Sequence, residues 1–508
     1  MSQQVLQGAC YVENLTLVNL SGEWVDLTNV CANLKIYEGL DDTFCHGRLS
    51  IVDGLDLLKN YKIVGQESLT IRIRALDQSE SDGWTNLENS IDKEFRVYAV
   101  SDETVDKSFT TKTYVLHFTD PKEFIARQTR INESLRGSYS SMLISMWRKY
   151  MFPAEADIEV LTDAWQESKP ENKQVNVPNW TLMETFKYLE RNANAEDSNW
   201  RNSFFFFGSL FGNRQRFITF DKMKEYKIIP EFDCYPRYGH LATDDSDLDE
   251  LYVGLQTQVL NYTRPSRGNV LKGAVNGLYR GRLNSYDPVR KVERTNRYSM
   301  KKVYDEIEGE YPLVRLDAES ETIYKAGVFD DEMNADFTNT FELPFLDDVN
   351  EETLTTAEPY WVQKINATNA YSNQDKLLNS ETETKAETEW VGEEYKDAAM
   401  LERAALIGVL NQNTTNVIIP FRPDITVGAL IRLILPTEED DENINSMNDG
   451  DYVITHCVYE LEPMKGRGVI QMKCAKDGYD VDIREWSPLK ETTPAKETST
   501  GGGGGRSM

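Results

Sequence analysis

The chain has 508 residues and carries 84 Asp or Glu against 55 Lys or Arg, a formal charge of −29. This length exceeds what one hydrophobic core usually holds, so we expect roughly three or four domains. Such a negative charge disfavours general nucleic-acid binding, because neutralising phosphates requires Lys and Arg. The apolar content of 40% is enough to form packed cores, which excludes a disordered chain.

The termini and cysteines favour synthesis and assembly in the cytoplasm. No apolar run is long enough to cross a bilayer, and the first residues lack the basic and apolar regions of a secretion signal. We therefore expect no membrane insertion. The six cysteines form no CxxC pair, so a zinc site or disulfide framework is not indicated. Cys457 and Cys474 could face each other across a hairpin, but we expect two buried thiols.

Residues 11–120 read as a series of strands. In the clearest of them, Leu69, Ile71 and Ile73 alternate with polar residues, which predicts one buried and one solvated face. Several strands at close spacing favour a barrel or a sandwich over a sheet with crossover helices.

Helices follow. Asp120 and Pro121 are typical of a helix start, and the dense apolar residues of 138–151 predict a buried helix. Over 180–193, Thr181 and Glu184 have the spacing of a capping box. The run Phe204–Phe207 then predicts a buried strand, since a ligand platform is the rarer use of such a run.

The last third returns to β structure after a long insertion. Residues 393–410 predict a helix, and 413–435 with 451–476 predict a small antiparallel unit that has a turn at Gly428. After Trp486, polar residues and glycines dominate, so we expect a disordered tail.

The insertion has two halves of opposite charge. Residues 261–305 contain eleven Lys or Arg and three Asp or Glu, whereas 306–402 contain 25 acidic and six basic residues. In the basic half, tyrosines are interleaved with charges, which suits a protein-docking surface, a solvated surface or a groove for single-stranded nucleic acid. We favour protein docking because the whole chain is acidic. The predicted docking patch comprises Arg264, Arg267, Lys272, Arg280, Arg282, Arg290, Lys291, Arg294 and Arg297.

The sequence offers no catalytic or metal-binding motif. The four histidines occur singly, and no phosphate-binding loop, dinucleotide fingerprint or nucleophile elbow is present. We therefore expect a protein that is not an enzyme and that uses no cofactor or metal.

Three segments resemble the central baseplate hub proteins of contractile-tailed bacteriophages of the T-even type. The first is the helix and hairpin of 175–223, with its WTLMETFKYLERNA helix. The second is the helix AAMLERAALIGVLNQN, which leads into a strand and the turn Asp424–Gly428. The third is the Tyr452–Val453 strand before the final β run. The resemblance covers 11–260 and 395–480.

The resemblance implies an α+β, mainly β chain that contains two similar antiparallel β-barrel-like tube domains. It implies a homotrimer that acts as a symmetry adaptor, because a threefold ring presents six similar surfaces only if each subunit carries the docking unit twice. The expected domains are a first tube domain at 1–118, a helical domain at 119–227, a second tube domain at 228–262 plus 400–480, an inserted peripheral lobe at 263–399, and a tail at 481–508.

The family's partners follow from the same resemblance. We expect the central spike, the tail tube initiator or tape-measure protein, and the baseplate wedges, all in the tail of a virion. We also expect a lumen through which DNA passes without specific binding, with an acidic lining as one use of the negative charge.

Two other functions stay open from the sequence. A carbohydrate-binding or adhesin module of a phage particle would use exposed tryptophans, for which Trp84, Trp165 and Trp390 are candidates. A peptidoglycan hydrolase is the other, although no acid and nucleophile spacing supports it.

Overall fold

The computed structural model describes residues 8–75, 85, 89–106, 111–151, 165–169, 173–195, 198–226, 229–233, 257–267, 278, 280–287, 292–300, 303, 361–365, 394–434 and 450–478. Within these residues the protein is mainly β, with one large, almost wholly antiparallel sheet and a few helices. No described helix is both long and apolar enough to cross a bilayer.

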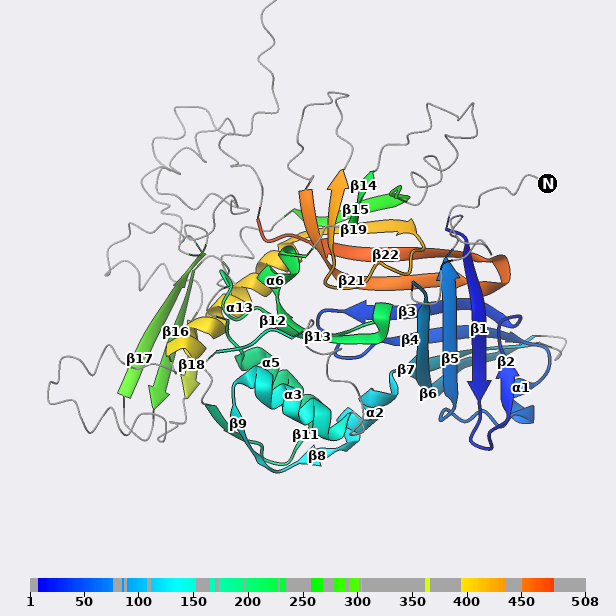
Figure 1. Ribbon diagram of the computed structural model, residues 1–508, viewed down its shortest axis with the longest axis horizontal. Coiled ribbons are helices and arrows are strands. Elements are labelled where there is room, and N and C mark those ends of the chain that lie inside the picture. Colours follow the sequence, from blue (N-terminus) through cyan, green and yellow to red (C-terminus); the bar gives the residue numbers. More distant parts are fainter. Residues whose placement is uncertain are drawn as a thin grey trace, which may run out of the picture.

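The first β unit occupies one end of the molecule (Figure 1). Its spatial strand order is β3-β4-β7-β6-β5-β1-β2, and neighbouring strands are antiparallel. The alternation predicted around Leu69 is confirmed, because Leu69, Ile71 and Ile73 are fully buried. The elements are β1 (Cys10–Val18), β2 (Trp24–Asp26), β3 (Cys31–Gly39), β4 (His46–Asp53), α1 (Leu57–Asn60), β5 (Ser68–Ala75), β6 (Ile91–Val105) and β7 (Lys112–Thr119).

The second β unit continues the same sheet. Its strands follow the order β15-β19-β22-β21; β20 lies beside the first half of β21, and β14 lies beside β20. The pairing of β14 with β20 is parallel. The elements are β14 (Ile229–Asp233), β15 (Asn261–Arg267), β19 (Asn413–Pro420), β20 (Leu430–Ile434), β21 (Gly450–Glu462), the 3₁₀ turn η4 (Pro463–Lys465) and β22 (Arg467–Ala475).

A helical unit lies beside both β units in Figure 1. Its helices are α2 (Pro121–Gln128), α3 (Tyr139–Tyr150), α5 (Leu182–Asn192) and α6 (Phe220–Lys224). Its short strands are β8 (Arg130–Ile131), β9 (Ser134–Gly137), β10 (Lys173–Asn176), β11 (Trp180–Thr181), β12 (Phe204–Ser209) and β13 (Arg214–Thr219), with η1 (Phe211–Asn213) between the last two.

Local chemistry sets the helix ends. The Asp120 side chain accepts a hydrogen bond from the Lys122 N–H, and Pro121 opens α2. At α5, the Thr181 hydroxyl accepts from the Glu184 N–H, and the Glu184 carboxylate accepts from the Thr181 N–H, which completes a capping box. The prediction that 138–151 is buried is only partly right, because α3 buries one face and exposes Arg148 and Lys149.

An aromatic core holds the helical unit together. The predicted buried strand is confirmed, since Phe204, Phe206 and Phe207 are fully buried in β12. Trp147 of α3 packs edge-on against Phe206, with ring centroids 5.5 Å apart. Such pairs contribute about 0.5–1.5 kcal/mol beyond the area that they bury.

The rest of the described chain forms a long helix and a small sheet. Helix α13 (Glu394–Gln412) leads into β19, and it lies close to a three-stranded sheet of order β17-β16-β18 (Figure 1). Those strands are β16 (Arg280–Asp287), β17 (Val292–Ser299) and β18 (Trp361–Ile365).

The prediction that Cys457 and Cys474 are two buried thiols is confirmed, because both cysteines are free and buried. The register places Cys457 opposite Met472 and Cys474 opposite Ile454, so the two residues are not direct partners across β21 and β22.

Candidate assembly site

The two β units meet through backbone pairing of β3 with β21. The pairing is antiparallel and runs from His456 opposite Gly39 to Leu461 opposite Leu34. We call these paired residues the seam. Leu34 and Leu461 are fully buried there. On the other face, the Lys35 Nζ lies 2.6 Å from a Glu460 carboxylate oxygen. The seam therefore combines strand hydrogen bonds, apolar burial and an ion pair.

The two β units share one strand order. The first unit contains β3 to β7, which lie side by side in the order β3-β4-β7-β6-β5. In the second unit, β15, β19, β20, β21 and β22 pair as β15-β19-β22-β21, with β20 beside β21. Both arrangements place the first, second, fifth, fourth and third strands side by side, and every pair is antiparallel.

The correspondence extends to single residues. In β6 the register against β7 shifts between Val97 and Ala99, and in β21 the register against β22 shifts between Ile454 and His456. Just before each shift, one N–H turns to the strand on the other side: Val97 N–H donates to the Glu67 carbonyl (2.9 Å), and Ile454 N–H donates to the Ala429 carbonyl (3.0 Å). Each fourth strand thus passes from one neighbour to another at an equivalent β-bulge.

The two units differ in the link between their first two strands. Residues 40–45 join β3 to β4, whereas residues 268–412 separate β15 from β19. The small sheet of β16–β18 and helix α13 belong to this long connection.

A buried carboxyl group lies where the two β units and the helical unit meet. Glu38 of β3 is 2% exposed. One of its oxygens accepts from the Thr426 hydroxyl (3.0 Å), the Val427 N–H (3.2 Å) and the Tyr459 hydroxyl (3.0 Å). Its other oxygen accepts from the Leu210 N–H at the end of β12. Burial raises the pKa of Glu38, and these hydrogen bonds only partly offset that effect.

Close backbone packing supports the same junction. Gly428 has a φ of +77°, and a Cβ built there would lie 2.7 Å from the ring of Phe207. The sequence predicted a turn at Gly428; the structure adds that the turn packs against β12. A side chain at this position would meet both a strained backbone and the aromatic ring.

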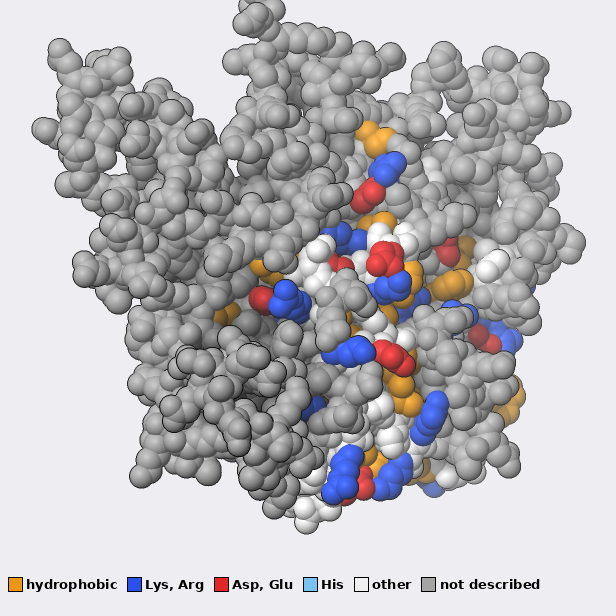
Figure 2. Space-filling model, turned by 60° about the vertical axis from the view of Figure 1, so that its left-hand side comes forward, with side chains coloured by type: hydrophobic (Ala, Val, Ile, Leu, Met, Phe, Trp, Pro, Cys, Tyr) orange, Lys and Arg blue, Asp and Glu red, His pale blue; other side chains and the backbone are white. Residues whose placement is uncertain are grey.

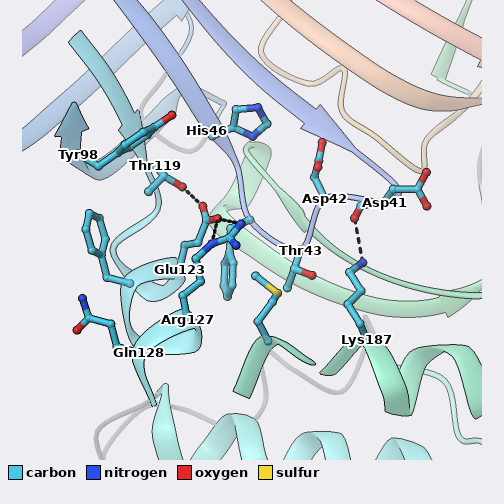
Figure 3. Close-up of a pocket in the computed structure, with 13 residues that line it drawn as sticks. Asp41, Asp42, Thr43, His46, Tyr98, Thr119, Glu123, Arg127, Gln128 and Lys187 are labelled. Carbon is cyan, nitrogen blue, oxygen red and sulfur yellow. Dashed lines mark hydrogen bonds and ion pairs between the residues drawn. The ribbon is translucent and has the colours of Figure 1, made fainter. Parts of the chain in front are cut away.

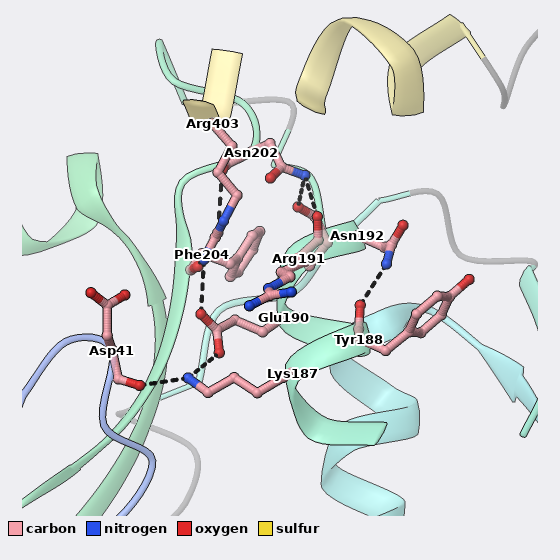
Figure 4. Close-up of polar contacts among 10 residues, drawn as sticks. Asp41, Lys187, Tyr188, Glu190, Arg191, Asn192, Asn202, Phe204 and Arg403 are labelled. Carbon is pink, nitrogen blue, oxygen red and sulfur yellow. Dashed lines mark hydrogen bonds and ion pairs between the residues drawn. The ribbon is translucent and has the colours of Figure 1, made fainter. Parts of the chain in front are cut away.

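A charged network ties the helical unit to the first β unit and to helix α13 (Figure 4). Glu190 of α5 pairs with Arg403 of α13 (2.8 Å) and with Lys187 (2.9 Å). The Lys187 ammonium also donates to the Asp41 carbonyl in the β3–β4 link (2.9 Å). Arg403 donates to the Phe204 carbonyl (2.6 Å). The Glu190 side chain is 2% exposed, so these two cations compensate the cost of burying it.

A second carboxyl group with a raised pKa belongs to α6, near the end of β22. Asp221 accepts a hydrogen bond from the Trp200 N–H (3.0 Å), and the Trp200 indole N–H donates to Asp477 (3.0 Å). Lys224 lies 3.2 Å from Asp477. Burial raises the pKa of Asp221 to about 6.

A cleft of about 610 Å³ opens between the first β unit and helices α2 and α5 (Figure 3). Its charged side chains already contact one another: Glu123 accepts from Arg127 (2.6 Å) and from Thr119. The His46 ring stacks on Tyr37, with centroids 5.3 Å apart. The cleft is a gap between two units in which Glu123, Arg127 and Lys187 are paired, and this arrangement favours no particular reaction.

The structure divides the predicted basic patch. Arg264 is half-buried in β15 and donates to the Tyr452 hydroxyl (3.0 Å) and to the Thr415 hydroxyl (3.3 Å). Arg267 ends β15. Arg280, Arg282, Arg294 and Arg297 lie on the β16–β17 hairpin, whose register sets Arg282 directly opposite Arg297. Lys272, Arg290 and Lys291 lie outside the described residues. The docking role of the patch stays a prediction.

The tryptophans considered as sugar platforms are not gathered on one described surface. Trp165 packs against Phe206 and Phe217, with ring centroids 5.6 and 5.8 Å apart. Trp84 and Trp390 lie outside the described residues. Among the residues that the structure describes, no group of three or more His, Cys, Asp or Glu could hold a metal ion.

The charged surface is mixed. Where side chains are described on the face turned forward in Figure 2, basic and acidic residues are interspersed with apolar ones. Sequence reasoning missed the junction at Glu38, although this residue follows Leu34 and Ile36 in the same alternation as a core-facing residue.

No family model matches the sequence, and no curated protein matches it. Among solved structures, the chain is similar to the tail protein from Neisseria meningitidis MC58, with 8% identity, a TM-score of 0.44, and coverage of 92% of this chain and 96% of the other. It is similar to the 43 kDa tail protein of prophage MuSo2 from Shewanella oneidensis, with 9% identity, a TM-score of 0.44, and coverage of 91% and 98%. The E. coli c3393 protein, a type VI secretion component described as similar to the T4 bacteriophage tail proteins gp27 and gp5, matches with 7% identity, a TM-score of 0.32, and coverage of 94% and 79%. The chain is thus structurally similar to phage tail proteins.

Proposed function

We propose that this protein is a structural subunit at the centre of a phage tail baseplate, where three copies form a hub. The observation that carries the proposal is the repeated five-strand unit, present twice in one chain and joined by the pairing of β3 with β21. A threefold ring of such chains presents six similar units, which suits a junction between a sixfold tube and a threefold spike.

In this proposal the repeated units are the tube domains of the hub, at 1–118 and at 228–262 plus 400–480. The helical unit at 119–227 braces them, as the contacts of Glu38, Glu190 and Arg403 allow. We assign partner contacts to the part of the predicted lobe at 263–399 that follows β15, and to the tail at 481–508. Those partners are the central spike, the tube initiator or tape-measure protein, and the baseplate wedges.

The solvent-facing side of the continuous sheet is proposed to line a passage for DNA. Its described residues do not support an acidic lining, because Arg48 is exposed, Lys473 is half-exposed, and Glu460 is paired with Lys35. A polar, mixed-charge surface still suits transit without tight binding, since strong attraction of phosphates needs a dense array of cations.

The test is the mass of the protein in solution, measured by light scattering over a range of concentrations. The proposal expects a stable species of three times the 58.3 kDa chain, with six similar densities around its axis in electron micrographs. A single chain at every concentration would overturn it.

A further inference from the structure

The cleft between the first β unit and the helical unit has the size of a binding site. One wall comes from the link between β3 and β4 with His46 and Tyr98, and the other comes from α2 and α5 (Figure 3). Its volume of about 610 Å³ falls in the usual range of ligand pockets, which is about 300–1,000 Å³. Both walls belong to one chain, so the cleft exists whatever the number of chains in the proposed hub.

The charges that line the cleft are unevenly satisfied. Its two basic side chains already have acidic partners: Arg127 donates to Glu123 (2.6 Å), and Lys187 pairs with a glutamate outside the cleft (2.9 Å). The aspartates of the β3–β4 link, Asp41 and Asp42, form no ion pair with any residue that the structure describes. Asp42 is also half-buried, so water screens its charge less than that of a surface residue. The cleft therefore favours a cation.

Apolar side chains cover much of the remaining lining. Tyr98 is 49% exposed on one wall, and Phe124 of α2 and Met183 of α5 are half-buried on the other. Phe44 lies deeper, where its ring stacks on that of Trp147 with centroids 6.0 Å apart. Aromatic rings attract cations, and the side chains of Lys and Arg join a cationic head to an apolar stem. This lining suits such a side chain better than a small hydrated ion.

A buried hydroxyl group without a partner lies in the same cleft. Thr43 lines it and is 3% exposed, and its hydroxyl makes no hydrogen bond with the described part of the chain. The Thr43 carbonyl accepts a hydrogen bond from the Gln215 side chain (2.8 Å), so the backbone is held in place here. Buried polar groups nearly always have partners, and a ligand with a peptide backbone would supply the missing one.

We propose that this cleft binds a short basic segment of a partner protein. A Lys or Arg of the segment pairs with Asp42, and its stem lies between Tyr98 and Phe124. An apolar neighbour in the segment packs against Met183, and its backbone bonds the hydroxyl of Thr43. The charge of −29 on the whole chain favours approach of such a partner. Nucleic acid does not fit, because carboxylates repel phosphates.

Synthetic peptides test this assignment on the intact chain. The probes are acetylated pentapeptides that carry Arg, Lys, citrulline or Glu at the centre and Leu, Phe or Ser on each side. Saturation-transfer difference NMR detects weak binding and yields the affinity by titration. We expect the Arg and Lys peptides with apolar neighbours to bind roughly fivefold or more tightly than their citrulline counterparts, because the charged hydrogen bond is lost in citrulline. Replacing both neighbours by Ser should weaken binding by a similar factor.

Matched variants locate the bound peptide. Asp42→Asn removes the charge and keeps the shape of the turn, and we expect it to remove the preference for Arg over citrulline. Glu167→Gln neutralises an exposed carboxyl group of the helical unit outside the cleft and should leave the preference unchanged. Thr43→Val replaces the unpartnered hydroxyl by a methyl group of similar size. We expect it to weaken binding without lowering the melting temperature, because the hydroxyl stabilises nothing in the free protein.

Three results would overturn the inference. The first is equal binding of Arg, citrulline and Glu peptides, or none by any peptide at about 10 mM. The second is equal behaviour of Asp42→Asn and Glu167→Gln. The third is competition by spermidine as strong as that by the best peptide, since this would show a site for small cations. The mass of the protein is measured in the same samples. Selective binding by a single chain would support the cleft assignment although the proposed hub had failed.

Discussion

Strands β21 and β6 occupy equivalent positions but differ in the strands that they pair with. They hold the same place in their β units, and each has a bulge at the equivalent point, between Ile454 and His456 and between Val97 and Ala99. Beyond the bulge, β21 pairs with β3 and its Leu461 is fully buried, whereas within the described residues this half of β6 pairs only with β7 and its Val105 is 45% exposed. In the part of the chain that the structure describes, the same position is therefore paired on both sides in one unit and on one side in the other.

The covered edge is also the one that other units reinforce. Glu38 on β3 accepts hydrogen bonds from the turn before β20, from Tyr459 on β21 and from the end of β12. Strand pairing alone leaves the angle between two units free to vary, and a buried, fully hydrogen-bonded carboxyl group restricts it.

The largest expected effect comes from removing that carboxyl group. Glu38→Ala leaves several buried donors without an acceptor, so we expect the free energy of unfolding to fall by roughly 3–5 kcal/mol. Chemical denaturation followed by tryptophan fluorescence measures this. An effect below about 1 kcal/mol would mean that the junction contributes little to holding the units together.

Glu38→Gln separates charge from shape and gives a pH test. Because burial raises the pKa of Glu38 in the folded protein, the folded state retains a proton that the unfolded chain has already lost. The wild type is therefore relatively stabilised at low pH and loses that contribution as pH rises through the raised pKa. The Gln variant cannot lose a proton at this position, so we expect its stability to fall less between mildly acidic and neutral pH. Identical pH profiles would contradict the assignment.

The amino-acid sequence predicts local structure here better than it predicts the junctions. Alternation identified the strand around Leu69, and the spacing of Thr181 and Glu184 identified the start of α5. Both features depend on neighbours along the chain, which the sequence displays directly. The seam instead pairs Leu34 with Leu461, and no local pattern records which of many apolar strands will meet.

The basic segment shows the same limit. Its composition indicated one docking patch, but β15 places Arg264 in the second β unit, whereas Arg282 and Arg297 face each other on a separate hairpin. Charge density along the chain could not reveal this division, because the long insertion begins in the middle of the basic run. Glu38 was within reach of sequence reasoning, since a carboxyl group in line with Leu34 and Ile36 predicts a buried acid.

A smaller effect should come from shortening an apolar side chain, either on β21 where β3 covers it or on the second half of β6. Leu461→Ala creates a cavity in the covered seam, so we expect it to cost about 2–4 kcal/mol. Val105→Ala removes a half-exposed side chain and should cost less than about 1 kcal/mol in a single chain. Urea denaturation measures both costs, and equal costs would contradict the comparison.

The smallest effect concerns the ion pair on the seam. Lys35 and Glu460 lie 2.6 Å apart, but their side chains are 21% and 24% exposed, so water and salt screen them. Burial raises the pKa of Glu460, and the hydrogen bonds from Lys35 and Asn33 outweigh it, which leaves the pKa below its ordinary value. A double-mutant cycle with Lys35→Ala and Glu460→Ala should give a coupling of about 0.3–1 kcal/mol that decreases with added salt. If the coupling energy between Lys35 and Glu460 is zero, the ion pair does not stabilise the seam, and the apolar residues beside it supply the stability.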